Sequence, residues 1–427
     1  MIEPHPIHVD IPFRPWEEEL PNGAHLTQLP IDSERLLRLD ICFRAGKNTQ
    51  TMPLQAQLAI GQLPVSSTCY PPERVAELLD YYGATLTATC SQSCACLTLI
   101  CLPRFLSELL PLLFSLLNEP AYDAGQLEIA CDTLLTEWRI NRQKVSKISK
   151  ETLFKQIFPA NHPLAQLPEE AHFGQVDGAL LRSYWQRYLH AANAAIFLTG
   201  KMDREIETLV RKTLGEPVWG GGEAAEVASP PMPSPPKERG FCSVAMPCPT
   251  VQTALRAGFI LPPLTHADMP ALKLTSTILG GYFGSRLMSN IREDKGFTYH
   301  IGSRILQCPG GSLLTIGTEV KSGVVWKALE EVEHEVERLS GELVGEEELA
   351  IVKNYVAGCA CRQYEAHIDI AELLISLWRT GRTIDDLLRE HRQLQATTAE
   401  EVRRVAQTYL PLEHSVFVLA GDVPDRD

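Results

Sequence analysis

The chain has 427 residues, of which 44% are hydrophobic and 22% are charged. This composition is ordinary for a soluble protein, and the length is enough for two domains that each bury a core. The formal net charge of −14 argues against a general nucleic-acid binder, because contact with phosphates needs a basic surface.

The start of the chain shows no targeting segment. Its first twenty residues contain no basic stretch followed by an apolar one, which a secretory signal requires. No run of about eighteen apolar residues occurs, so we predict no membrane span. Twelve cysteines in such a chain are typical of reduced thiols, and we therefore predict a cytoplasmic location.

The first half reads as short strands interspersed with amphipathic helices. Pro72 suits a first helical turn, Gly83 a helix end and Asp123 a helix cap, while Pro111 is expected to kink or restart its helix. The spacing of apolar residues predicts strands over 36–43 and 195–200, two strands within 85–101, and helices over 54–63, 72–82 and 180–189 and from Pro103 and Asp123.

A Pro- and Gly-rich segment then divides the chain nearly in half. It contains Gly220 to Gly222 and the run SPPMPSPP at 229–236, a composition typical of a semi-rigid exposed linker. We predict an N-terminal domain over 1–218, a linker over 219–239 and a C-terminal domain over 240–427.

The second half repeats the first. Gly200 and Gly421 each end an apolar strand pattern and lie 221 positions apart, and the Tyr-Leu pair at 188–189 recurs at 409–410 with the same offset. The predicted fold class is α+β, with two homologous halves. Each half is expected to be a largely antiparallel sheet with helices packed on one face.

The stretch from Gly280 to His300 carries the candidate binding residues. Gly280 and Gly281 permit a close backbone approach, a short amphipathic helix follows, and Gly296 is expected to end it. A strand pattern from Phe297 would place Arg292 near Tyr299, two hydrogen-bond donors suited to a peptide carbonyl. The alternative is a surface arginine on a helix and an aromatic ring packed in a sheet.

This stretch resembles a known signature. SRLMSNIREDKGFTY is similar to the C-terminal-half motif of the M16 (pitrilysin, insulinase and processing-peptidase) family, and FPANHPLAQLPEE resembles a first-half segment. The resemblance implies two homologous α+β halves in a clam-shell. It also implies that Arg292 and Tyr299, seven residues apart as in the family, contact a substrate peptide.

The family's zinc motif is degenerate in this chain. Active members carry His-x-x-Glu-His on a helix, where two His reach one zinc ion and the Glu serves as base. The matching stretch here is LQAQLAIGQL, which places Gln57, Ile60 and Gly61 at the motif positions. Glu137, 76 residues after Gly61, takes the place of the third ligand. It is alternatively only a polar residue on an amphipathic helix. We predict no bound metal and no cofactor.

Four clustered cysteines are a second metal candidate. Cys90, Cys94, Cys96 and Cys101 do not follow a standard zinc spacing, although strand alternation would place the first three on one face. Buried structural thiols are the alternative.

The resemblance therefore implies an inactive subunit of the bacterial M16B type. Such a chain would bind an extended peptide and supply Arg292 and Tyr299 in trans to an active zinc M16 peptidase in a heterodimer, or would pair with itself in a homodimer. Alone it should have no peptidase activity. One alternative is a scaffold or peptide-holding protein without a peptidase partner, and another is a peptidase with unconventional ligands. The acidic balance would attract basic peptides if its charges lay near the binding surface.

Overall fold

The computed structural model describes residues 7–220, 230–246 and 248–426, and two sheets organise them. The first sheet has the strand order β1-β2-β6-β3-β5-β4 and the second β7-β11-β8-β10-β9. The strands are β1 Trp16–Glu19, β2 His25–Pro30, β3 Leu37–Phe43, β4 Thr85–Cys90, β5 Ala95–Cys101, β6 Ala194–Gly200, β7 Gly240–Val244, β8 Gln252–Leu261, β9 Ile301–Cys308, β10 Gly311–Lys321 and β11 Ser415–Ala420.

Apart from the additional edge strand β1, the two sheets share one topology, which confirms the predicted fold of two similar, largely antiparallel halves. In each, a strand near the end of the half (β6 or β11) pairs antiparallel with a central strand (β3 or β8) and parallel with a strand on its other side (β2 or β7). Gly200 is the last residue of β6 and Gly421 directly follows β11, and their φ values are 105° and 142°. A Cβ at Gly200 would lie 2.3 Å from the Leu36 carbonyl oxygen, so the repeated glycine is required by close approach as well as by φ.

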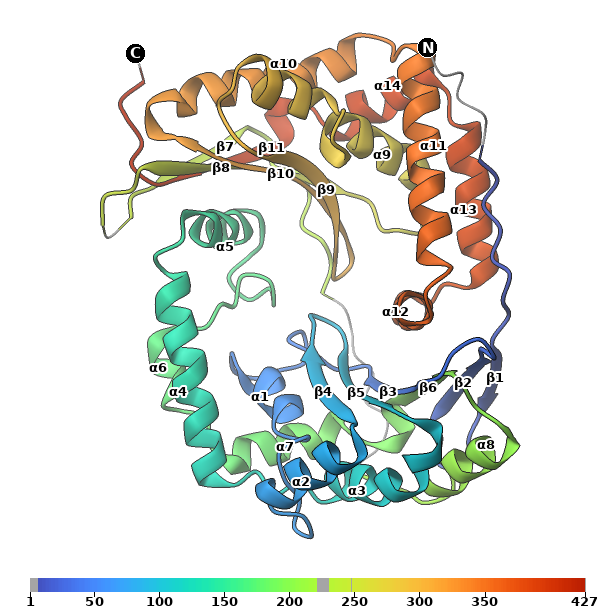
Figure 1. The fold of residues 1–427 in the computed structure, drawn as a ribbon. Coiled ribbons are helices and arrows are strands. Elements are labelled where there is room, and N and C mark those ends of the chain that lie inside the picture. The colour runs from blue at the N-terminus through green and yellow to red at the C-terminus, as the bar shows by residue number, and fades with distance from the viewer. Residues whose placement is uncertain (1–6, 221–229, 247, 427) are drawn as a thin grey trace.

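Helices cover the outer face of each sheet (Figure 1). Helices α1, α3 and α7 pack against the first sheet and α9, α10 and α14 against the second. The helices are α1 Gln55–Gly61, α2 Pro72–Tyr82, α3 Leu106–Asn118, α4 Ala124–Asn141, α5 Val145–Ile157, α6 Glu170–Phe173, α7 Gly178–Tyr188, α8 Arg204–Val210, α9 Met269–Ser276, α10 Val325–Gly341, α11 Glu346–Gln363, α12 His367–Thr380, α13 Ile384–Ala396 and α14 Ala399–Tyr409.

Local signals placed most helix ends correctly. Pro72 begins α2, Gly83 ends it with φ 59°, and the Asp123 carboxylate accepts hydrogen bonds from two backbone amides at the start of α4. The predicted restart at Pro111 is wrong. Helix α3 runs through Pro111, and its leucines on both sides of the proline are buried in the first core. Packing of those leucines outweighs the loss of one backbone hydrogen bond.

Besides the helices on the outer faces, the inner faces of the sheets are covered by helices exchanged between the halves. Helix α5, from the first half of the sequence, lies on the inner face of the second sheet, and α12, from the second half, lies on the inner face of the first (Figure 1). Leu153 of α5 packs against Val416 and Val418 of β11, while Leu374 of α12 packs against Phe197 of β6.

Polar contacts reinforce the position of α12. Arg38 on β3 donates hydrogen bonds to both carboxylate oxygens of Asp40 at 2.8 and 2.9 Å, to Glu372 of α12 at 2.5 Å and to the Ile368 carbonyl at 3.4 Å. A buried, charge-assisted network of this kind fixes one orientation of the helix on the sheet.

The linker region joins these halves. Trp219 is completely buried in the first core and donates a hydrogen bond to the Leu214 carbonyl at 2.9 Å. Part of the SPPMPSPP run lies outside the described residues, so the division at 218 and 240 stays a prediction. Over the described part of the chain, no helix combines the length and apolar character needed to cross a membrane.

Candidate functional site

Arg292 lies on a π-helical turn, Met288–Asp294, whose apolar side is anchored in the second core. Ile291 is fully buried there, and its carbonyl accepts a 3.0 Å hydrogen bond from the Phe297 amide. Gly296, with φ 65°, closes the turn as predicted. The buried anchor and the glycine stop together fix where the arginine leaves the helix.

The strand after this turn begins later than the sequence pattern predicted. β9 starts at Ile301, so the predicted strand from Phe297 is wrong. The Thr298 hydroxyl lies 2.9 Å from the Glu319 carbonyl oxygen and 3.0 Å from the His300 carbonyl oxygen, and its one proton is donated to either of them. The Thr318 hydroxyl lies 2.9 Å from the His300 carbonyl oxygen, to which it donates. These side-chain bonds hold 298–300 as a loop, because they take the place of ladder hydrogen bonds.

This loop leaves Tyr299 in the open. Its side chain is 93% exposed, which rules out the alternative of an aromatic ring packed in the sheet. Arg292 is half-buried, with its guanidinium 4.4 Å from the ring centroid of Phe283 and its Nη1 buried without a hydrogen-bond partner. Phe283 is itself 63% exposed. The segment thus presents a guanidinium donor, a phenol and an exposed ring.

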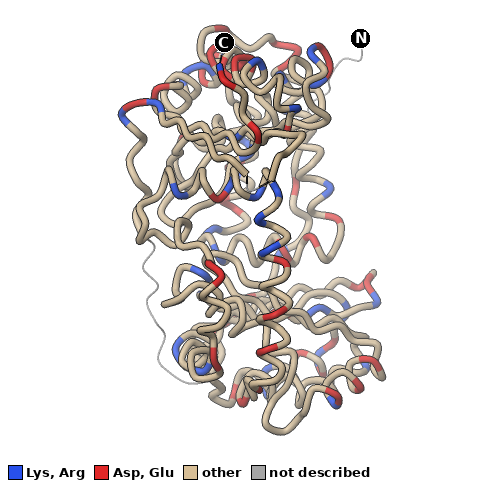
Figure 2. The backbone as a smooth tube through the Cα atoms, turned by 90° about the vertical axis from the view of Figure 1, so that its left-hand side faces the viewer, with Lys and Arg blue, Asp and Glu red and all other residues tan. Residues whose placement is uncertain are grey.

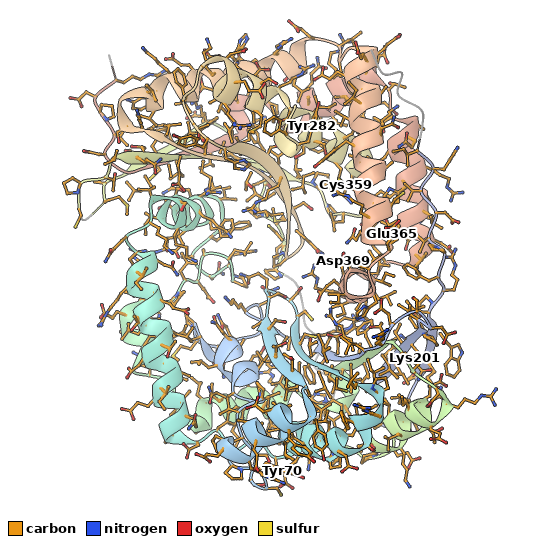
Figure 3. All side chains as sticks on the ribbon, viewed as in Figure 1. Tyr70, Lys201, Tyr282, Cys359, Glu365 and Asp369 are labelled. Atoms are coloured by element: carbon orange, nitrogen blue, oxygen red, sulfur yellow. The ribbon has the colours of Figure 1, made fainter. Side chains whose placement is uncertain are left out.

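A cavity of about 570 Å³ lies beside this segment, on the inner face of the second sheet. Tyr299 forms part of its wall, together with the two glycines that precede the turn. The predicted close approach at Gly280 is real, since a Cβ there would lie 2.5 Å from the Ser303 amide nitrogen of β9. Tyr282, which follows the two glycines, is labelled in Figure 3. Its ring centroid lies 5.2 Å from that of Tyr355 on α11, and this contact supports the segment from the side of α11.

The residues at the degenerate zinc positions do not fit a metal. Gln57 and Gly61 are only partly buried on α1, and a Cβ at Gly61 would meet open space. Ile60 is 1% exposed and belongs to the first core, while Glu137 is exposed on α4. Over the described ranges, no group of three His, Cys, Asp or Glu side chains is placed to hold a metal ion. A single carboxylate with an amide is a poor zinc site.

The predicted arrangement of the cysteines is wrong in one respect. Cys90 pairs across the hairpin with Ala95, and Cys96 pairs with Thr89, so Cys90 faces the opposite side of the sheet from Cys96. The hairpin turn between the strands breaks the simple alternation on which the prediction rested.

The inner-face thiols gain a neighbour that sequence reasoning missed. Cys94 and Cys96 lie under α12, and Cys42 of β3 joins them because it pairs directly with Cys96. Burial raises the pKa of the Cys42 thiol well above its ordinary value. These are buried structural thiols, whereas Cys101 lies in the first core beyond the sheet.

Sequence reasoning also missed two arginines on the inner face of the second sheet. Arg256 on β8 and Arg304 on β9 both line the cavity that Tyr299 borders. Arg256 donates to the Ser149 hydroxyl at 3.2 Å and to the Ser146 carbonyl at 3.4 Å, both at α5. A signal existed, since Arg256 is the only charged residue in the strand QTALRAGFIL.

Comparisons with known proteins agree with this architecture. The family model described as the peptidase M16 inactive domain matches residues 175–356. A Bacillus subtilis protein described as an uncharacterized zinc protease, YmxG, is 22% identical over 360 residues, which cover 82% of this chain and 84% of that protein.

Two solved structures have the same fold over nearly the whole chain. A peptidase M16 inactive domain from Pseudomonas fluorescens superimposes with a TM-score of 0.85 at 21% identity, covering 97% of this chain and 99% of that one. A protease from Helicobacter pylori gives a TM-score of 0.86 at 16% identity, with coverage of 96% and 99%.

Proposed function

Since the chain is an M16-family protein of the inactive type, we propose that it is the substrate-binding partner subunit of an active zinc M16 peptidase. The exposure of Tyr299 carries this proposal. Tyr299 is 93% exposed and forms part of the cavity wall. Arg292 does not line that cavity, but its half-buried guanidinium lies on the turn seven residues earlier and its Nη1 lacks a hydrogen-bond partner, so we assign both donors to the ligand.

In the proposed mechanism the partner subunit performs the hydrolysis. An extended peptide adds as a strand to a sheet edge of the partner. Arg292 and Tyr299 then reach across the interface and donate hydrogen bonds to the carbonyl oxygen beside the scissile bond. Both donors stabilise the negative charge that develops on that oxygen as the carbonyl is attacked.

The division of labour follows from the residues on α1. Gln57, Ile60 and Gly61 supply neither the two imidazoles nor the carboxylate base of the zinc motif. The chain alone is therefore expected to show no peptidase activity. The alternative of a peptidase that binds its metal through unconventional ligands has no support among the described residues.

The main alternative is a scaffold or peptide-holding protein without a peptidase partner, either as a single chain or as a homodimer. The donors of Arg292 and Tyr299 would serve peptide holding equally well. A cytoplasmic location is part of both proposals, and it is supported by twelve cysteines that are all free thiols.

A pull-down of the tagged chain from its own cells tests the proposal. We expect a second M16 chain with an intact His-x-x-Glu-His motif to co-purify with zinc and peptidase activity. The double variant Arg292→Ala, Tyr299→Phe should keep the partner but lower kcat by about a hundredfold, as loss of positioned oxyanion donors does.

The matched control is Arg74→Ala with Tyr81→Phe, which removes an exposed arginine and tyrosine at the same spacing on α2. This control should leave activity unchanged. Recovery of the chain alone, free of zinc and inert, would favour the peptide-holding alternative. Full activity of the Arg292 and Tyr299 double variant would refute the role of the pair.

A further inference from the structure

Four basic residues from four different elements converge near the cavity that Tyr299 borders. Arg256 and Arg304 project from the inner face of the second sheet and line that cavity. Lys150 on α5 directly follows Ser149, whose hydroxyl accepts the 3.2 Å hydrogen bond from Arg256. Burial and the charges of neighbouring cations, among them Lys47 in the loop after β3, lower the pKa of Lys150. We call Lys47, Lys150, Arg256 and Arg304 the basic cluster. Both halves of the chain contribute to it.

The sheet is built to accommodate these long side chains. Arg256 is directly opposite Gly317 of β10, and a Cβ at Gly317 would lie 3.0 Å from the Arg256 Nη1. Gly317 is in turn opposite Gly302 of β9. The two glycines leave a glycine-lined floor beside the Arg256 guanidinium, and a side chain at Gly317 would crowd that group.

Arg304 lies on β9, two residues beyond Gly302. It is directly opposite Thr315 of β10, which is buried and also lines the cavity. Arg304 is exposed and makes no ion pair or hydrogen bond with any residue that the structure describes. Its five donors are therefore available to a molecule that enters from outside.

The charges of the basic cluster are not neutralised within the described part of the chain. None of its four members forms an ion pair there, whereas Lys147, one turn before Lys150, pairs with Glu151 at 3.5 Å. Glu319 also lines the cavity and acts on Arg256 as an opposite charge, yet it forms no ion pair with it. Burial, and then the charge of Arg304, lower the pKa of both Lys150 and Arg256.

This local sign is opposite to that of the whole chain. The sequence has a net charge of −14, and both basic and acidic residues lie in the middle of the molecule (Figure 2), but the cavity lining has two arginines and one glutamate. Cations held together in a partly desolvated cavity repel one another, and that repulsion is relieved when an anion enters. The total charge of the chain would attract basic peptides, whereas the two arginines in the cavity lining would attract acidic ones.

We propose that the cavity binds an acidic segment of an extended peptide, with side-chain carboxylates held by Arg256, Arg304 and Lys150. This inference rests on the proposed peptide-binding function and names its substrate class. A peptide fits better than a small anion because Tyr299 and the backbone of the glycine-lined floor share the same wall and can contact a main chain between carboxylates. The planar guanidinium is suited to bidentate carboxylate contacts.

Fluorescence anisotropy on the full chain tests the preference. The probes are a labelled extended peptide with several glutamates, its glutamine analogue and its lysine analogue. We expect the glutamate peptide to bind at least about tenfold more tightly than the glutamine peptide, and the lysine peptide to bind weakest. The advantage should shrink between about 0.05 and 0.5 M NaCl, because salt screens partly exposed charges.

Variants then assign the preference to these side chains. Arg304→Gln and Lys150→Gln should each weaken the glutamate peptide by about fivefold to tenfold while leaving the glutamine peptide unchanged. Lys155→Gln is the matched control, because it removes an exposed lysine from the same helix that does not belong to the basic cluster. Inorganic phosphate is included as a competitor, and displacement of the peptide at equal molar concentration would show a simple anion site and overturn the peptide assignment.

The outcomes separate the two proposals. If all three peptides bind equally, or the lysine peptide binds best, the acidic preference is wrong while peptide binding stands. If no peptide binds to the chain alone, the same titration is run on the complex recovered with its partner. Absence of binding there as well would overturn both the proposed function and this inference.

Discussion

Gly61 is the residue at which the lost zinc motif can most easily be rebuilt. A side chain added there would enter open space, and Gln57 lies one helical turn earlier on the same side of α1. The double variant Gln57→His, Gly61→His should therefore fold. We expect zinc to raise its Tm by a few degrees, because two imidazoles at this spacing bind the ion without completing a four-ligand site.

Thermal unfolding with zinc and with a chelator measures this effect, and Gln57→Ala, Gly61→Ala is the control. The double-histidine variant should still lack peptidase activity, since Ile60 at the position of the base is buried in the core. Adding Ile60→Glu should lower the free energy of unfolding by about 3 kcal/mol, because it buries a carboxylate. Peptidase activity in the double-histidine variant would contradict our reading of the site.

The residues of the candidate site were predictable from sequence to different degrees. Arg292 and Tyr299 stand in a motif whose spacing resembles a known family. The exposure of Tyr299 was not predictable, because it depends on hydrogen bonds from Thr298 and Thr318 that replace strand pairing. The neighbours of Cys42 and of Arg304 were equally unpredictable from the sequence, because they depend on which strands pair.

At the scale of elements, Asp268 ties the beginning of α9 to α14. Its carboxylate accepts hydrogen bonds from Arg404 at 2.5 Å and from the Tyr409 hydroxyl at 2.9 Å. The Arg404 hydrogen bond holds the pKa of Asp268 below its ordinary value. Asp268→Asn should lower the free energy of unfolding at neutral pH by about 1 kcal/mol, a modest figure because Arg404 is half exposed to solvent.

The pH dependence of this contact has a defined sign. A carboxyl whose pKa is lower in the folded than in the unfolded state stabilises the protein above its unfolded pKa of about 3.9, and that stabilisation disappears as the pH falls through the folded value. The difference between wild type and Asp268→Asn, measured by urea unfolding, should therefore shrink below about pH 4. The control is Glu413→Gln, because Glu413 is an exposed acid whose carboxylate lies 3.9 Å from His414. A constant difference from pH 7 to pH 3 would contradict the assignment.

Elements defined by local signals were predicted better than elements placed by distant contacts. Pro72, Gly83 and Asp123 mark their helix ends through backbone geometry and capping, which act within a few residues. The positions of α5 and α12 depend on apolar faces that meet strands hundreds of residues away in the sequence. No local pattern distinguishes a helix that covers its own sheet from one that covers the other.

The exchange of α5 and α12 gives the whole molecule its cohesion. Each sheet is left with an uncovered apolar inner face if the other half is removed. For the first sheet this face includes Phe197 and Cys42, which are 1% and 0% exposed in the intact chain. For the second it includes Leu313 and Val418, both fully buried. The halves are therefore expected to be interdependent in folding, although each has its own sheet and outer helices.

Separate expression of residues 1–220 and 230–427 tests that interdependence. Each fragment alone should expose the inner face of its sheet, bind a hydrophobic dye and unfold without a sharp transition, because the first fragment lacks α12 and the second lacks α5. Co-expression should yield a one-to-one complex that unfolds cooperatively, since both exchanged helices then regain their sheets. The same complex with Leu153→Ala, which removes a fully buried contact of α5, should dissociate more readily than one with Leu110→Ala in the first core. If fragment 1–220 is instead monomeric, dye-free and cooperative in unfolding, the exchanged helices are peripheral additions. The basic cluster takes Lys47 and Lys150 from the first fragment and Arg256 and Arg304 from the second. It would then form only where the two folded halves dock.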